Sequence, residues 1–129
     1  MARATVSGVK MYRLRIEAKF DSAHKMDGYE GKCAKLHGHT YKVEVFVVAE
    51  KVDSIGISVD QQVVKEKLGK ITDRFDHSFL NDFKEIGNPS MENIARYIFV
   101  TLKDLPAGAK LEKVRVWETP RSWCEYFER

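Results

Sequence analysis

Three of the four histidines in this chain have a spacing that suits metal binding. His37 and His39 are separated by Gly38 alone, so in extended backbone both imidazoles leave the same face of a strand. His24 precedes this pair, and an antiparallel strand pairing across the intervening loop brings it opposite them. Three neutral imidazoles on one patch suit a catalytic zinc ion with an open coordination position. The alternative interpretation is surface or hydrogen-bonded histidines at a strand end.

A cysteine lies in the loop between these histidines. Cys33 precedes His37 by four residues and has lysines nearby. A thiol beside a dication and positive side chains has a lowered pKa, which makes Cys33 a candidate base or nucleophile. A fourth zinc ligand and an inert small residue are the alternatives. Cys124 lies in an aromatic stretch, where packing is the favoured role.

Two further sites carry possible acid–base and binding chemistry. Asp76 directly precedes His77, and an aspartate beside a histidine can orient the imidazole for proton transfer, although such pairs also occur on solvated loops. Glu118 ends a segment with alternating valines. Its carboxylate can accept two parallel N–H bonds from a guanidine-like ring edge, or it can simply be solvated.

The segments around these residues predict the elements that position them. Residues 11–18 and 40–49 alternate apolar and polar side chains, which indicates two long antiparallel strands. Asp60 and Ser90 occupy N-cap positions before apolar stripes of helical period. Two later segments predict two more strands, 111–118 and 122–127. The order ββααββ favours an α+β fold with two helices on one face of a four-stranded antiparallel sheet.

Length and composition limit the class of protein. The 129 residues suit one domain, expected over 11–129, with residues 1–10 as a leader of unknown role. A net charge of +3 is too small to indicate a nucleic-acid partner. No apolar run approaches the roughly 18 residues of a membrane span, and no export signal is visible. We therefore expect a cytoplasmic protein with reduced thiols and no membrane partner.

Five co-linear motifs resemble the 6-pyruvoyl-tetrahydropterin synthase superfamily, over a match from about Tyr12 to Tyr126. They are Phe20-Asp21-Ser22-Ala23-His24, Cys33-x-x-x-His37-Gly38-His39, Asp76-His77-x-x-Leu80-Asn81, Asn88-Pro89-Ser90-x-Glu92-Asn93 and Glu118-Thr119. The resemblance implies the tunnelling fold (T-fold) and a Zn2+ ion held by His24, His37 and His39.

The spacing between the cysteine and the paired histidines separates branches of this family. Animal-type pyruvoyl synthases place five residues there, whereas this chain has three, Ala34-Lys35-Leu36. That is similar to the 6-carboxy-tetrahydropterin synthases of the 7-deazaguanine pathway, which leads to queuosine and archaeosine. A third branch, a substitute for dihydroneopterin aldolase, uses a glutamate in this loop, and none of the three residues is glutamate.

The resemblance implies conversion of 7,8-dihydroneopterin triphosphate to 6-carboxy-5,6,7,8-tetrahydropterin, acetaldehyde and triphosphate. Cys33 would remove a side-chain proton, and His77, oriented by Asp76, would relay protons. Glu118 would pair with the 2-amino group and N3–H of the pterin, with Thr119 adding a hydrogen bond. The candidates for the triphosphate, Lys25, Lys32 and Lys35, cannot be ranked from the sequence.

The resemblance also implies an assembly. Family members form trimeric barrels that stack as hexamers with sites between subunits, so we expect a homo-hexamer in which Asp76 and His77 belong to a neighbour of the zinc-binding chain. Two alternatives remain open. One is 6-pyruvoyl-tetrahydropterin synthase activity, which eliminates triphosphate and keeps the carbon–carbon bond. The other is a non-catalytic protein that binds zinc or a pterin.

Overall fold

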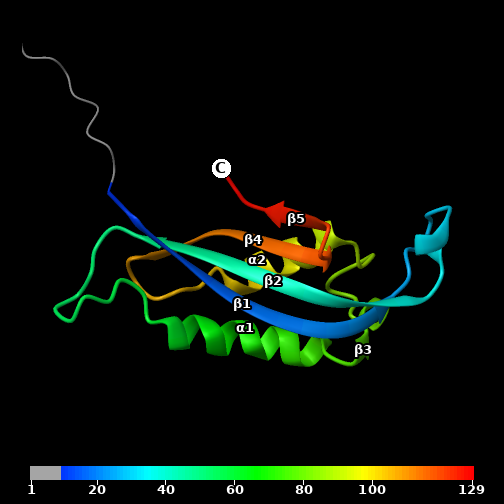
Figure 1. Cartoon of the computed structure of the whole chain (residues 1–129), viewed down its shortest axis with the longest axis horizontal. Coiled ribbons are helices and arrows are strands. Elements are labelled where there is room, and N and C mark those ends of the chain that lie inside the picture. The colour runs from blue at the N-terminus through cyan, green and yellow to red at the C-terminus, as the bar shows by residue number, and fades with distance from the viewer. Residues whose placement is uncertain (1–9) are drawn as a thin grey trace, which may run out of the picture.

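Two long strands form the centre of the molecule, whose computed structural model describes residues 10–129 apart from the side chain of Cys33. β1 (Tyr12–His24) and β2 (His37–Ala49) pair antiparallel over their whole length, and His24 lies opposite His37 at one end. β4 (Ala109–Thr119) pairs antiparallel with β2, and β5 (Ser122–Tyr126) pairs antiparallel with β4. These four strands match the predicted antiparallel sheet (Figure 1).

The sheet has a fifth strand that the sequence did not predict. β3 (Ser78–Phe79) pairs parallel with Ser22 and Ala23 of β1, so the order across the sheet is β3-β1-β2-β4-β5. The expected four-stranded, purely antiparallel sheet is therefore wrong in this detail. A strand of two residues is too short to show the alternation by which strands are recognised.

Both helices begin where their caps predict. α1 (Gln61–Phe75) follows Asp60, whose side chain accepts a hydrogen bond from the Gln62 backbone N–H. α2 (Met91–Leu102) follows Ser90, whose hydroxyl accepts one from the Asn93 backbone N–H. Each cap satisfies a backbone donor that the first helical turn leaves without a partner. Two short 3-10 turns complete the fold, η1 (Lys32–Ala34) and η2 (Leu80–Asp82).

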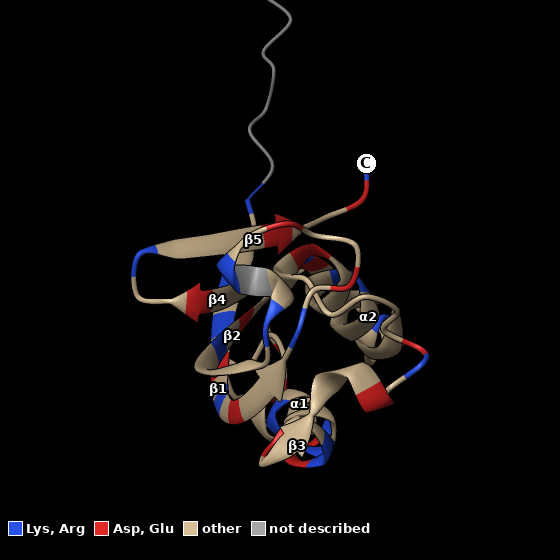
Figure 2. Ribbon diagram, turned by 90° about the vertical axis from the view of Figure 1, so that its right-hand side faces the viewer, with Lys and Arg blue, Asp and Glu red and all other residues tan. Residues whose placement is uncertain are grey.

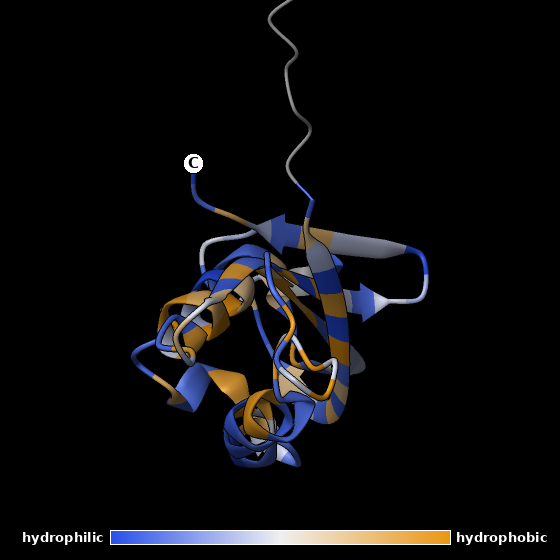
Figure 3. Ribbon diagram, turned by 90° about the vertical axis from the view of Figure 1, so that its left-hand side faces the viewer, coloured by the Kyte–Doolittle hydropathy of each residue, from blue (hydrophilic) through white to orange (hydrophobic). Residues whose placement is uncertain are grey.

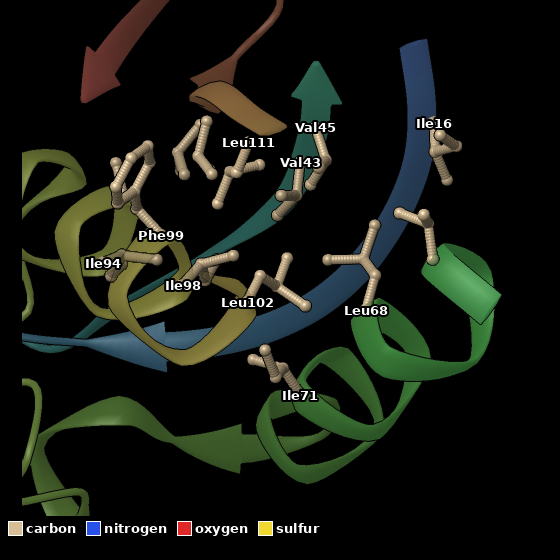
Figure 4. Packing of buried hydrophobic residues seen from close by; sticks show 14 of the residues in the cluster. Ile16, Val43, Val45, Leu68, Ile71, Ile94, Ile98, Phe99, Leu102 and Leu111 are labelled. Carbon is tan, nitrogen blue, oxygen red and sulfur yellow. The ribbon is translucent and has the colours of Figure 1, made fainter. Parts of the chain in front are cut away.

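The apolar faces of the two helices cover one face of the sheet. Figure 2 shows α1 and α2 on the same side of the strands, which confirms the predicted α+β arrangement. Leu68 and Ile71 of α1 and Ile98 of α2 point into the same layer as the alternating valines of β2 (Figure 4). Because strand side chains alternate, every second residue of β1 and β2 enters this core.

The opposite face of the sheet carries charged and aromatic side chains. Hydrophilic and hydrophobic residues alternate along β1, the strand that continues from the grey trace in Figure 3. Glu44 of β2 lies on the outer face yet is only 3% exposed. The side chains of Arg15 and Trp117 both donate hydrogen bonds to its carboxylate, as a buried charge requires.

The leader expected over residues 1–10 lies outside the described residues, except for Lys10. In the part of the chain that the structure covers, neither helix combines the length and the apolarity needed to cross a membrane.

Candidate functional site

The three predicted metal ligands converge at one end of the sheet. His24 is the last residue of β1, His37 is the first residue of β2, and the two are direct cross-strand partners. His39 lies two residues further along β2, on the same face as His37. The ring centroids of the three histidines are 4.5–5.2 Å apart. The strand pairing thus produces the cluster that the spacing predicts.

Backbone carbonyls fix the orientation of two of these rings. Nδ1 of His24 lies 2.7 Å from the carbonyl oxygen of Pro89, and Nδ1 of His37 lies 2.6 Å from that of Lys35. Since a carbonyl can only accept, each Nδ1 carries the proton and each Nε2 keeps a free lone pair. Metal-binding histidines are commonly held in this way by a hydrogen bond at the other ring nitrogen.

The two free nitrogens face each other at a distance that fits a shared ion. Nε2 of His24 and Nε2 of His37 are 3.0 Å apart. Two unprotonated nitrogens cannot form a hydrogen bond, so with both rings neutral this close approach needs a shared cation, either a proton or a metal ion. In a tetrahedral site with Zn–N distances of about 2.0–2.1 Å, neighbouring ligand atoms lie about 3.3 Å apart. The donor set therefore fits a divalent metal ion.

The third histidine and Glu118 complete the cluster. One ligand atom from each of His24, His37, His39 and Glu118 lies within 4.8 Å of the others. Nε2 of His39 is 3.0 Å from Oε1 of Glu118, but the direction of approach makes no hydrogen bond, and this nitrogen is buried without a partner. Burial lowers the pKa of His39 more than the Glu118 charge raises it, and the other two histidines lower it further. The ring is therefore neutral near pH 7, as metal binding requires.

A pocket adjoins this cluster. It has a volume of about 550 Å³. It lies at the end of the β2–β4 pairing, next to the last pair, Lys42 and Trp117. His39, Glu118 and Thr119 line it. The size suits a small-molecule ligand. A larger hollow of about 700 Å³ lies at the other end of β2, near Val48 and Ala49, away from the histidines.

Asp76 and His77 form a separate cluster. Nδ1 of His77 lies 2.9 Å from a carboxylate oxygen of Asp76. Asp76 also accepts a hydrogen bond from the Asp21 backbone N–H, and this bond, with His77, lowers its pKa. His77 has a positive φ of 54° and a side chain that is 81% exposed. In a single chain the dyad groups with Asp21 and not with the three histidines.

The remaining predicted residues take less direct positions. The side chain of Cys33 lies outside the described part of the structure, and its backbone belongs to the η1 turn between β1 and β2. Thr119 lines the pocket, but its hydroxyl also accepts a hydrogen bond from the Arg121 backbone N–H in the turn between β4 and β5. The triphosphate candidates, Lys25, Lys32 and Lys35, are exposed.

Two asparagines support the site in a way that the sequence did not reveal. Asn81 exchanges two hydrogen bonds with the backbone of Lys25, at 3.0 and 2.9 Å. Asn88 forms the same kind of bridge with the backbone of Asp27, at 3.1 and 3.0 Å. Together they hold the loop that follows His24. Both residues lie within the family motifs, which was the only available signal of a role.

Comparisons with known proteins agree with this geometry. The model of the family described as 6-pyruvoyl tetrahydropterin synthase matches residues 13–129. A 6-carboxy-5,6,7,8-tetrahydropterin synthase of Haemophilus influenzae is 36% identical, covering 92% of this chain and 100% of the relative. The enzyme of the same name from Synechocystis sp. is 34% identical, covering 91% and 94%. A dihydroneopterin monophosphate aldolase of Pyrococcus furiosus is 36% identical, covering 82% and 89%.

A solved structure shares the fold. The 6-pyruvoyl tetrahydropterin synthase of Caenorhabditis elegans superposes with a TM-score of 0.79 at 26% identity, covering 94% of this chain and 98% of that one. The match of sequence and fold extends over nearly the whole of both chains, and it includes every strand that carries a site residue. The chain therefore belongs to the 6-pyruvoyl tetrahydropterin synthase family.

Proposed function

We propose that this protein is a zinc-dependent 6-carboxy-5,6,7,8-tetrahydropterin synthase. It converts 7,8-dihydroneopterin triphosphate and one water molecule to 6-carboxy-5,6,7,8-tetrahydropterin, acetaldehyde and triphosphate, in the biosynthesis of 7-deazaguanines such as queuosine. The names of the relatives from Haemophilus influenzae and Synechocystis sp. support this choice within the family. The short spacing between Cys33 and His37 supports it independently.

One observation carries the metal-dependent part of the proposal. His24 and His37 present unprotonated Nε2 atoms to each other at 3.0 Å, while their Nδ1 atoms donate to backbone carbonyls. His39 adds a third, neutral ring. Three imidazoles and an adjoining pocket suit zinc with one position open for substrate. A zinc ion held there would supply a Lewis acid able to polarise an oxygen of the substrate side chain and so acidify the neighbouring C–H group.

Glu118 orients the heterocycle. The carboxylate lies at the wall of the 550 Å³ pocket, next to the histidine cluster. A carboxylate that accepts two parallel N–H bonds fixes both the position and the rotation of a planar ring. The N3–H and 2-amino groups of a pterin provide such a pair of donors. Glu118 thus directs the substrate side chain toward the three histidines, which lowers the entropic part of the barrier.

Proton transfer is assigned to Cys33 and to the Asp76–His77 dyad. Cys33 removes the side-chain proton as a thiolate, and its place in the loop between the two histidine-bearing strands supports this role. Asp76 holds Nδ1 of His77, which leaves Nε2 to donate or accept a proton. Since the dyad is exposed and apart from the histidines of its own chain, we assign it to the site of a neighbouring subunit in a hexamer.

The decisive experiment is product identification. Purified, zinc-loaded protein is incubated with 7,8-dihydroneopterin triphosphate, and the products are analysed by mass spectrometry together with an assay for acetaldehyde. We expect 6-carboxy-5,6,7,8-tetrahydropterin and acetaldehyde. A pyruvoyl product without acetaldehyde would instead establish the second candidate, 6-pyruvoyl-tetrahydropterin synthase activity, which the structural match to the nematode enzyme favours.

The non-catalytic alternative has its own test. A protein that only binds zinc or a pterin has no need for a reactive thiol, so Cys33→Ala would leave its biological activity intact. The proposed enzyme predicts that turnover of this variant collapses while its zinc content, measured by atomic absorption, stays at the wild-type level. Cys124→Ala is the matched control, because Cys124 lies on β5, where burial raises the pKa of its thiol.

A further inference from the structure

Two residues on the same face of β2, His39 and Tyr41, carry buried polar atoms without hydrogen-bond partners. Among the described residues, the side-chain nitrogens and oxygens that are buried and lack a hydrogen bond are Nε2 of His39 and the hydroxyl of Tyr41. These residues are two apart on one face of the strand. Buried polar groups in folded proteins are nearly always paired, so each exception needs an explanation. A metal ion explains His39, but nothing assigned so far explains Tyr41.

Packing fixes the Tyr41 ring beside the candidate site. The residue is fully buried, and its ring stacks on Phe20 with centroids 4.8 Å apart. The edges of His24 and His39 meet the same ring at centroid distances of 5.9 and 5.6 Å. The hydroxyl therefore cannot reach solvent water by a simple rotation of the side chain.

Glu118 is the charged group nearest in register. Lys42 lies opposite Trp117 in the pairing of β2 with β4, so continuing by one residue places Tyr41 opposite Glu118 on the core face. Burial raises the pKa of Tyr41, and the negative charge of Glu118 raises it further. A phenol O–H can donate a hydrogen bond to this anion, whose oxygens can only accept.

The Glu118 carboxylate has acceptor positions left for the Tyr41 hydroxyl. Its Oε1 atom lies 3.0 Å from Nε2 of His39. That nitrogen makes no hydrogen bond, so it occupies none of the acceptor positions of the carboxylate. A carboxylate has about four acceptor positions, enough for the two N–H groups of a pterin edge and one phenol.

We propose that Tyr41 is a positioning residue whose hydroxyl donates a hydrogen bond to the Glu118 carboxylate in the ligand-bound site. This inference rests on the proposed binding of a pterin by Glu118. Tyr41 does not touch the reacting atoms. It holds the carboxylate in the orientation that receives the ring, so its loss weakens ligand binding and leaves the metal in place.

The test uses Tyr41→Phe, which removes the oxygen and keeps the stacked ring. Binding of neopterin, a fluorescent pterin, is measured by titration of the zinc-loaded proteins. We expect the Kd of Tyr41→Phe to rise by about tenfold, the usual effect of losing a hydrogen bond to a charged group. Zinc content is expected to be unchanged. Thermal unfolding without neopterin is expected to start no earlier, because the missing hydroxyl had no partner there.

Tyr97→Phe is the matched control. The Tyr97 hydroxyl accepts a hydrogen bond from Arg74 at 3.2 Å, which links α2 to α1. This variant should bind neopterin like the wild type and lose a little stability. If Tyr41→Phe instead lowers the unfolding temperature and leaves the Kd unchanged, the hydroxyl has a structural partner such as a buried water, and the proposal is overturned.

A double-mutant cycle shows whether Tyr41 acts through Glu118. In the Glu118→Gln background, Tyr41→Phe should change the Kd by far less than it does in the wild type. Equal effects in both backgrounds would mean that the hydroxyl contacts something else, against the proposal. If the wild-type protein binds no neopterin at all, the pterin function itself fails and the Tyr41 inference falls with it. Normal wild-type binding with an unchanged Tyr41→Phe value overturns the inference alone.

Discussion

At the scale of single residues, the site depends on which ring nitrogen of each histidine carries the proton. His24 and His37 each give Nδ1–H to a backbone carbonyl, and those carbonyls belong to Pro89 and Lys35. The backbone therefore sets the tautomer, and no acidic side chain is needed. His77 is held differently, because the partner of its Nδ1 is the Asp76 carboxylate and its ring is exposed. The first arrangement favours metal binding, and the second favours proton transfer.

Because of this difference, we expect substitution of His37 to remove zinc and substitution of His77 to slow turnover only. His37→Ala removes one of the nitrogens that face the shared position, so we expect the purified variant to contain less than one zinc per chain and to be inactive. His77→Ala leaves the three ligands untouched. Its zinc content should equal that of the wild type, while turnover falls by about 100- to 10,000-fold, the usual contribution of a general acid or base.

Metal analysis and kinetics on the same preparations show which residues bind the metal and which transfer protons. A full complement of zinc in His37→Ala would show that the ligand assignment is wrong. Loss of zinc from His77→Ala would mean that the dyad binds metal and does not transfer protons. Lys84→Ala, a substitution at an exposed position, is the control for zinc lost during purification.

Glu44 makes a residue-level prediction about acid stability. Burial raises the pKa of this carboxyl, but hydrogen bonds from Arg15 and Trp117, with the charges of Arg15 and Arg115, outweigh it, so the net pKa lies below the usual value. A group with a lowered native pKa stabilises the fold above its unfolded pKa, about 4.5, and this contribution is lost as the pH falls through the native value.

We therefore expect Glu44→Gln to destabilise the protein at neutral pH and much less in acid. Loss of hydrogen bonds to a charged group predicts a decrease of about 1.5–3 kcal/mol in the free energy of unfolding at pH 7. Urea unfolding at pH 7 and again in acid, well below the unfolded pKa of about 4.5, measures the difference. A deficit of equal size at both pH values would contradict the ionic role. Glu50→Gln, at an exposed position, is the control.

Residue types identified the proposed metal ligands but not the residues that support them. The three histidines stand out because the chain has only four. Tyr41 does not, since a tyrosine in an alternating strand is expected to pack in the core, and nothing local shows that its hydroxyl lacks a partner. Asn81 bonds to the backbone of a loop 56 positions away. Such contacts depend on tertiary structure, which no local pattern encodes.

At the scale of elements, the start of α2 links helix stability to the metal site. Ser90 caps the helix through the Asn93 N–H, and the preceding carbonyl, that of Pro89, holds His24. Displacement of the Pro89 carbonyl therefore disturbs both the tautomer and the orientation of the His24 ring. The N-cap of α1, Asp60, has a similar bond to Gln62 and lies away from the histidines.

Comparison of the two caps separates these effects. Ser90→Ala and Asp60→Ala should each lower the free energy of unfolding by about 1 kcal/mol. Only Ser90→Ala should also weaken zinc binding, by about tenfold or more, as loss of a ligand's supporting contact does. Competition with a zinc chelator measures the affinity, and chemical denaturation measures the stability. If both variants bind zinc equally well, the helix start does not orient His24.

The elements themselves were predictable wherever their patterns are long. β1, β2 and both helices repeat their apolar positions several times, so periodicity identified them and the caps marked where the helices begin. β3 was missed because it has two residues and exists only through its pairing with β1. The same pairing places the Asp76–His77 dyad next to Asp21, an outcome that the sequence did not predict.

At the scale of the whole molecule, one chain does not bring the predicted machinery together. The histidine cluster and Glu118 form one group, whereas Asp76 and His77 form another with Asp21. β5 also leaves one edge of the sheet without a strand partner within the described chain. An assembly that pairs sheet edges covers such an edge and can bring the dyad of one subunit to the histidines of the next.

Mixing two variants with complementary defects tests this arrangement. His37→Ala lacks a metal ligand and keeps the dyad, and His77→Ala has the reverse defect. If each site takes its metal from one chain and its dyad from another, random assembly of equal amounts restores both halves in about one site in four, hence about a quarter of wild-type turnover. The variants are co-refolded, and activity is measured with native mass spectrometry confirming mixed oligomers. Mixed oligomers without activity would place both halves of the site within a single chain.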